Sequence, residues 1–224
     1  MKTLIVTGGK FNKKFAVSFL EKNKYDYVIA VDRGLFYCES IGILPNVIVG
    51  DFDSYEGVDL SLYEKQGVTI RRYQPEKDDT DTEIAIKHAI EMNSDMDILG
   101  GTGGRIDHLL ANIHNLLIAL EKGVTARLID EGNIIYLKNS SFEINEDECI
   151  GKYISFIPFA GVVKGIKLKG FKYLLDGYNL KPGASRCISN ELAAELQIQL
   201  AAELGDPLPD VGGLGTQVFI VIVT

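Results

Sequence analysis

From Thr3 to Ile129 the chain alternates short apolar runs with longer amphipathic stretches. Apolar runs of this length predict buried strands, and here they are Leu4–Thr7, Tyr27–Asp32, Asn46–Gly50, Val68–Tyr73, Met96–Gly100 and Val124–Ile129. The clearest helices predicted between them are Thr82–Met92 and the leucine-rich Asp107–Glu121. Because strands and helices alternate, the sequence predicts an α/β fold with a doubly wound parallel sheet.

The pattern changes near Gly132, where short alternating segments replace the strand-and-helix rhythm. Glycine or proline separates these segments, which are Asn133–Lys138, Lys152–Phe156, Val162–Lys169 and Phe171–Leu175. Such a pattern predicts a small antiparallel β domain. We therefore expect an N-terminal domain over residues 1–131 and a C-terminal domain over residues 132–224.

The last part of the chain fits two patterns. Leucines recur every four residues from Leu192 to Leu204 in an Ala/Glu/Gln-rich run, which favours a helix, while Leu196, Ile198 and Leu200 alternate as in a strand. We expect the helix here, then a loop and an apolar strand over Thr216–Thr224. That strand would be prone to aggregation if exposed, so we expect it inside the β domain.

Composition and charge narrow the class of protein. With 46% hydrophobic and 24% charged residues, the chain resembles a soluble globular protein without a membrane segment. The net charge of −8 argues against a nucleic-acid surface, although acidic groups that hold a metal can still bind an anionic nucleotide. The three cysteines are far apart in the sequence and predict free thiols in a reducing compartment, the cytoplasm.

Two acidic motifs follow predicted strands. Asp51 and Asp53 are one residue apart in Gly50–Ser54, and Asp78 and Asp81 flank Thr80 in the second motif. Carboxylates at such spacing can share a hard cation such as Mg²⁺. Each motif also has a structural explanation, since aspartates often form turns and Thr80 can cap the next helix. The presence of both motifs together favours the metal site.

A third motif, Gly100–Gly104 followed by Arg105, lacks the lysine of a P-loop but suits phosphate. Its glycines let backbone N–H groups approach an anion, and a guanidinium can bind phosphate oxygens through two hydrogen bonds. In open α/β sheets the carboxyl ends of the strands form the ligand crevice, so we expect Asp32, Asp51, Asp53 and this turn on one edge.

These motifs, with Val31–Gly34 upstream and Ser189-Asn190-Glu191 downstream, together resemble the bacterial thiamine pyrophosphokinase family over about residues 1–191. The resemblance implies an α/β catalytic domain, a C-terminal β-sandwich and a homodimer with active sites between subunits. It also implies transfer of the terminal diphosphate of ATP to thiamine, which gives thiamine diphosphate and AMP.

The resemblance assigns roles residue by residue. It implies Mg²⁺ ligands that also act in catalysis at Asp51, Asp53, Asp78 and Asp81. It implies further catalytic residues at Arg105 and Asp107, and an ATP site formed by Asp32, Thr80, Gly103, Gly104 and Arg105. Ser189 and Asn190 would bind thiamine. Two alternatives remain open at this point: a diphosphokinase for another hydroxyalkyl heterocycle, such as a pterin, and a non-catalytic nucleotide-binding sensor.

Overall fold

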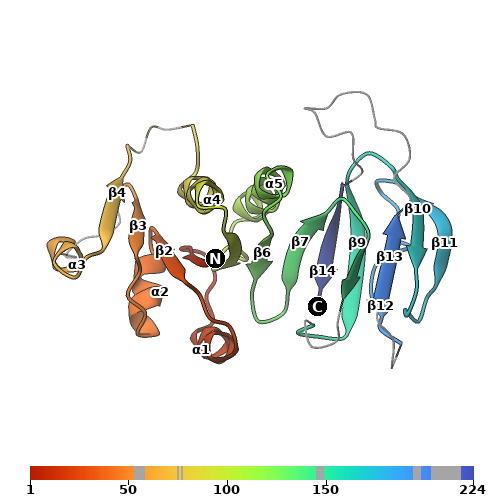
Figure 1. Ribbon diagram of the computed structural model, residues 1–224, viewed down its shortest axis with the longest axis horizontal. Coiled ribbons are helices and arrows are strands. Elements are labelled where there is room, and N and C mark those ends of the chain that lie inside the picture. Colours follow the sequence, from red (N-terminus) through yellow and green to blue (C-terminus); the bar gives the residue numbers. More distant parts are fainter. Residues whose placement is uncertain (53–58, 75, 77, 145–148, 194–197, 203–217) are drawn as a thin grey trace. The chain divides into compact units, whose positions relative to one another are not determined.

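The chain folds into two compact units, Met1–Glu131 and Gly132–Thr224 (Figure 1). The structure is a computed structural model that describes residues 1–52, 59–74, 76, 78–144, 149–193, 198–202 and 218–224. Across these ranges there is no helix of the length and apolarity needed to cross a membrane.

The first unit is built on a parallel sheet of six strands. In chain order they are β1 (Lys2–Val6), β2 (Tyr27–Val31), β3 (Val47–Gly50), β4 (Thr69–Arg72), β5 (Asp95–Leu99) and β6 (Ala126–Ile129). Their order across the sheet is β6-β5-β1-β2-β3-β4, and every pairing is parallel. The predicted doubly wound sheet is confirmed.

Helices cover both faces of this sheet. They are α1 (Lys13–Lys22), α2 (Gly34–Ser40), α3 (Ser61–Glu64), α4 (Asp81–Glu91) and α5 (Ile106–Glu121). Figure 1 shows α1 and α2 on one face and α4 and α5 on the other. Most of these strands are buried on both sides, with Leu4, Ile29 and Ile98 fully inaccessible, which explains why they form continuous apolar runs in the sequence. The edge strand β4 is the exception, since its residues are partly exposed.

The winding of the chain reverses at β1. From β1 the chain moves outward through β2, β3 and β4, and then returns to place β5 on the other side of β1. A ligand crevice is expected outside the carboxyl ends of the strands at such a reversal. A ligand site is therefore expected at the loops that follow β1 and β5.

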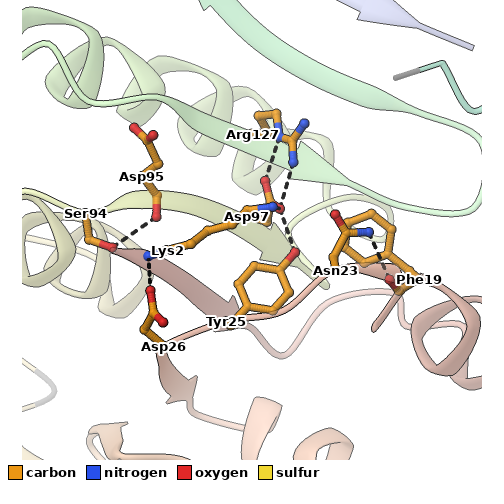
Figure 2. A network of polar contacts seen from close by, with 9 residues as sticks. All are labelled: Lys2, Phe19, Asn23, Tyr25, Asp26, Ser94, Asp95, Asp97 and Arg127. Carbon is orange, nitrogen blue, oxygen red and sulfur yellow. Dashed lines mark hydrogen bonds and ion pairs between the residues drawn. The ribbon is translucent and has the colours of Figure 1, made fainter. Parts of the chain in front are cut away.

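The amino ends of the same strands carry a buried charge network (Figure 2). Asp97 on β5 is 1% exposed and accepts hydrogen bonds from Arg127 on β6 and from the Tyr25 hydroxyl, at 2.6 Å to each nearest donor atom. Lys2 on β1 adds an ion pair at 2.9 Å. The network links three adjacent strands, β1, β5 and β6, on the edge opposite their carboxyl ends.

The second unit contains two antiparallel sheets. One has the order β12-β9-β14-β7 and the other β11-β10-β13-β8. Their bounds are β7 (Ile134–Lys138), β8 (Phe142–Ile144), β9 (Tyr153–Ala160), β10 (Val163–Leu168), β11 (Leu175–Leu180), β12 (Asn190–Glu191), β13 (Ile198–Ala202) and β14 (Val218–Val223). The rings of Phe142 on β8 and Phe219 on β14 stack across the two sheets, with centroids 6.0 Å apart. The predicted β-sandwich is confirmed.

Two predictions in this unit need correction. The helix expected after Leu192 is wrong over Ile198–Ala202, because that segment is the strand β13, paired on both sides with β8 and β10. The strand expected at Phe171–Leu175 is displaced: Phe171 makes a single bridge to Leu192, and β11 begins only at Leu175. The apolar terminal strand is confirmed, since β14 lies between β7 and β9.

Candidate functional site

A cavity of about 810 Å³ lies in the first unit, where the loops after β1 and β5 meet. Its lining combines glycine backbone with charged and aromatic side chains. The lining residues are Thr7, Gly8, Gly9, Lys10, Val31, Asp32, Arg33, Tyr37, Asp51, Thr82, Gly100, Gly101, Gly103, Gly104, Arg105, His108 and Asn112. The cavity therefore occupies the crevice that the sheet topology predicts.

The floor of the cavity is made of two interlocked loops. The Thr7 hydroxyl and the Gly9 N–H both donate to the Gly100 carbonyl, at 2.7 and 2.9 Å, and the Lys10 N–H donates to Thr102 O at 3.1 Å. A Cβ atom on Gly9 would collide with the Gly100 carbonyl, and one on Gly100 would collide with the Thr7 carbonyl. Glycine is thus required at both positions for the two chains to approach this closely.

Two carboxylates enter the cavity from adjacent strands. Asp32 follows β2 and has a φ of +46°, a left-handed conformation that is unusual for a residue other than glycine. Its carboxylate lies against Gly50, so closely that a Cβ atom there would collide with it. Asp51 comes next in the chain and lines the same cavity. Backbone strain of this kind is characteristic of functional sites.

Three cationic side chains line the cavity. Lys10 forms an ion pair with Glu131 at 2.9 Å, and Arg105 donates two hydrogen bonds to Asp107, at 3.1 Å from Nε and 2.5 Å from Nη2. The hydrogen bonds from Arg105 lower the pKa of Asp107. Among the described residues, the Arg33 guanidinium makes no hydrogen bond or ion pair, so it is available to an anion.

The predicted site residues of the first unit lie in several different parts of that unit. Those that line the cavity are Asp32, Asp51, Gly103, Gly104 and Arg105. Asp53 lies outside the described residues. Thr80 caps α4 by accepting a hydrogen bond from the Glu83 N–H at 3.2 Å. Asp81 is the first residue of α4, and Asp107 lies in the first turn of α5.

Asp78 lines a second cavity, of about 400 Å³, beside α4. Next to it, Lys87 donates a hydrogen bond to Asp79 at 2.6 Å, which lowers the pKa of that carboxyl, and also pairs with Glu83 at 2.8 Å. The described part of the chain contains no group of three or more His, Cys, Asp or Glu side chains arranged to hold a metal. The four-carboxylate metal site thus remains a prediction.

The second unit holds the predicted thiamine-binding pair. Ser189 has a φ of +55°, and its N–H donates to the buried Ser155 hydroxyl at 2.9 Å. Asn190 is 4% exposed and bonds to the backbone of Tyr173. The two residues therefore differ: a tight turn fixes the backbone of Ser189, while the Asn190 side chain is engaged within the protein.

Comparison with known proteins identifies the family. The family described as Thiamin pyrophosphokinase, catalytic domain, matches residues 20–128, and Thiamin pyrophosphokinase, vitamin B1 binding domain, matches residues 140–204. A thiamine pyrophosphokinase of Bacillus subtilis is 40% identical over 166 residues, which is 73% of this chain and 77% of the relative. The chain belongs to the thiamine pyrophosphokinase family. The predicted resemblance is confirmed, and the two alternatives are not favoured.

Solved structures of the thiamine pyrophosphokinase family share the fold. The crystal structure of the Bacillus subtilis protein matches with a TM-score of 0.79 and 28% identity, covering 100% of this chain and 99% of that one. The Geobacillus thermodenitrificans structure gives 0.77 and 26%, covering 99% and 96%. The match extends over the C-terminal residues that follow Ser189-Asn190-Glu191, where the sequence motifs had ended.

Several cavity residues were not predicted as site residues, among them Lys10, Arg33, Tyr37, His108 and Asn112. His108 and Asn112 are four apart on α5, a spacing that places them on one helix face and could have been recognised. The Asn112 amide donates to Gly101 O at 2.9 Å, and the Tyr37 hydroxyl donates to Gly9 O at 2.9 Å. Both side chains therefore hold the glycine loops in place.

Proposed function

We propose that this chain transfers the terminal diphosphate of ATP to the hydroxyethyl group of thiamine, giving thiamine diphosphate and AMP. The observation that carries the proposal is the cavity at the β1/β5 reversal, which joins backbone of two glycine loops to the carboxylates Asp32 and Asp51. Main-chain N–H groups in glycine turns suit phosphate oxygens. Membership of the thiamine pyrophosphokinase family supports thiamine and ATP as the two substrates.

The side chains of the cavity fit Mg²⁺. This ion is usually held by one or two carboxylates together with substrate phosphates and water, and rarely by an all-protein cage. Asp32 and Asp51, on neighbouring strand ends, supply such a pair, so three clustered acids are not needed. The family resemblance adds Asp53, Asp78 and Asp81 as further ligands. When bound, Mg²⁺ would neutralise charge on the phosphate oxygens.

The protein's own contribution is positioning and charge. Arg33 and Arg105 line the cavity and can bind phosphate oxygens, Arg105 by exchanging its hydrogen bonds with Asp107 for bonds to substrate. Fixed donors at the phosphate stabilise charge on the departing AMP without reorganisation in the transition state. Holding the thiamine hydroxyl in line with the β-phosphorus removes the entropic cost of their encounter.

We further propose that thiamine binds through the second unit and that the enzyme is a cytoplasmic homodimer. The match to a vitamin B1 binding domain spans residues 140–204, which include Ser189 and Asn190. Large apolar side chains of this unit are exposed, among them Tyr153, Leu174 and Ile188. The dimer is supported by these side chains and by the family resemblance. Free thiols at Cys38, Cys149 and Cys187 suit a reducing compartment.

Product analysis tests the proposal directly. The protein is incubated with ATP, Mg²⁺ and thiamine, and the products are identified by mass. AMP and thiamine diphosphate in equal amounts are expected, because attack at the β-phosphorus releases AMP. Release of ADP would show attack at the γ-phosphorus and would reject diphosphate transfer. Turnover only with a pterin acceptor, or nucleotide binding without any turnover, would support the alternatives.

A further inference from the structure

The side chain of Asn190 is used almost completely within the protein. Its Oδ1 accepts hydrogen bonds from the N–H groups of Tyr173 and Glu191, both at 3.0 Å, and its Nδ2 donates to Tyr173 O at 2.7 Å. A carboxamide has two donor hydrogens and two acceptor lone pairs, so three of its four bonds are made. The N–H of Tyr173 bonds to the amide oxygen of Asn190 and the C=O of Tyr173 bonds to the amide nitrogen, which fixes the orientation of the Asn190 amide.

These bonds join β12, in the first sheet, to the segment that leads into β11 of the second sheet. The backbone of Asn190 belongs to β12 and pairs with Ile154 on β9, in the first sheet. Tyr173 lies just before β11, in the second sheet. Between them, the Lys172 N–H donates to Glu191 O at 2.8 Å. The backbone of Asn190 pairs with β9 and therefore cannot pair with Tyr173. The Asn190 side chain forms hydrogen bonds with the Tyr173 backbone instead.

Tyr173 and Leu174 are the residues that this arrangement presents to solvent. They are 59% and 67% exposed, whereas Asn190 itself is 4% exposed. A buried amide with one remaining N–H has little capacity to contact a ligand, while the segment it holds is accessible. Residues 173, 174 and 190 all fall within the match to the vitamin B1 binding domain.

We propose that Asn190 is a positioning residue for thiamine binding, which acts by fixing the backbone of the Tyr173-Leu174 segment and makes no contact with the vitamin itself. The inference rests on the proposed function for its link to thiamine. Its structural half, that Asn190 fixes this segment, stands on the three hydrogen bonds and can be measured without any substrate.

The kinetic test compares Asn190→Ala with Asn179→Ala in the full-length chain. Asn179 lies on β11 and also accepts a backbone hydrogen bond, from the Gly165 N–H at 3.0 Å, so it is a matched control in the same unit. We expect Asn190→Ala to raise the KM for thiamine about tenfold, equivalent to about 1.4 kcal/mol, and to change the KM for ATP less than twofold. Asn179→Ala should change neither.

The second measurement follows the segment itself. The chain contains no tryptophan, so Tyr173→Trp introduces a single fluorescent reporter. Its anisotropy reports nanosecond mobility at this position. We expect added Asn190→Ala to lower the anisotropy and added Asn179→Ala to leave it unchanged. An Asn190→Ala protein with a raised thiamine KM and unchanged anisotropy would show direct contact with the vitamin, and would overturn the proposal.

Other outcomes also decide the matter. If Asn190→Ala lowers the anisotropy but leaves the thiamine KM unchanged, the segment has no part in binding and the proposal fails. If the KM values for ATP and thiamine rise together and the melting temperature falls, Asn190 is a general stability residue and the proposal fails. If the unaltered chain does not use thiamine, the proposed function fails, and the anisotropy alone then decides whether Asn190 fixes the segment.

Discussion

Arg127 holds Asp97 through two parallel hydrogen bonds, 2.6 Å from Nε to Oδ1 and 2.8 Å from Nη2 to Oδ2. The two residues are direct partners in the register of β5 and β6. Because Asp97 is almost wholly buried, the guanidinium is its main source of compensation for lost hydration.

Removing that guanidinium should destabilise the first unit. We expect Arg127→Met to lower the free energy of unfolding by about 3 kcal/mol, because Lys2 and Tyr25 then remain as the partners of the buried carboxylate among the described residues. Urea denaturation measures the change. Arg186→Met is a suitable control, since Arg186 lies over the Tyr178 ring and its loss should cost about 0.5 kcal/mol. Equal losses in the two variants would contradict the role given to Asp97.

The same network predicts how stability depends on pH. Burial alone would raise the pKa of Asp97, but the hydrogen bonds and charge of Arg127, with Tyr25 and Lys2, outweigh it and hold the pKa below its usual 3.8. A carboxyl group whose pKa is lower in the folded than in the unfolded protein stabilises the fold at pH values above its unfolded pKa. That contribution is lost as the pH falls through the pKa of the folded protein.

Acid titration of the unfolding free energy tests this sign. Stability of the unaltered protein should fall as the pH drops below about 3.8, the ordinary pKa of an aspartate. Asp97→Asn should be less stable at neutral pH and should lose less on acidification, since the amide does not titrate. A variant whose acid profile runs parallel to that of the unaltered protein would rule out Asp97 as the source.

Glycine at position 100 should be irreplaceable for steric reasons. Gly100 and Gly42 have nearly the same φ, +75° and +72°, but a Cβ atom on Gly100 would collide with the Thr7 carbonyl, whereas Gly42 has open space. Gly42→Ala should cost about 1 kcal/mol, for the backbone conformation alone. Gly100→Ala should cost clearly more and raise the KM for ATP. Similar stability and ATP KM in the two variants would mean that the loops can separate without consequence.

The acidic residues can be compared by their effect on Mg²⁺ dependence. We predict that Asp51→Asn and Asp78→Asn each lower kcat at least about 100-fold, equivalent to about 2.7 kcal/mol of transition-state stabilisation. Thermal stability should be unchanged or higher, because one repelling carboxylate is removed. Titration of activity with Mg²⁺ checks the first expectation, and thermal denaturation checks the second. Near-normal activity of Asp78→Asn would assign Asp78 to the second cavity that it lines and not to catalysis.

Arg105 offers a test of geometry at constant charge. Arg105→Lys should lower kcat/KM for ATP by about 10-fold or more, because an ammonium group cannot reproduce the planar pair of donors that Arg105 now directs at Asp107. Lys65→Arg makes the opposite exchange at an exposed position outside the cavity and serves as the control. It should leave kcat/KM for ATP unchanged. Full activity of Arg105→Lys would place Arg105 outside the phosphate site.

The sequence predicted the strands of the first unit well because most of them are buried on both faces. Runs such as Val47–Gly50 contain little besides apolar residues, and no helical period competes with them. Ile198–Ala202 was predicted wrongly for the opposite reason. Its leucine and alanine content favours a helix locally, but tertiary pairing with β8 and β10 on both sides decides the conformation.

Within the site, residues at strand ends could be predicted, whereas Tyr37, which α2 contributes, could not. Asp32 and Asp51 follow β2 and β3 directly, so topology alone places them at the crevice. Tyr37 reaches the cavity only because α2 packs against the end of β1, where Gly34 lies close enough to Val6 that a Cβ atom would collide. Such a contact depends on tertiary packing and leaves no local pattern.

The interlocked loops at Gly9 and Gly100 have a thermodynamic consequence for recognition. The main-chain N–H and C=O groups at the cavity floor have no side-chain rotamers to restrict. The hydrogen bonds between the two loops already fix the orientation of these groups. A ligand that meets them does not have to freeze several long side chains, each of which would cost about 0.5 to 1.5 kcal/mol. Much of the ordering required for binding is thus completed when the chain folds.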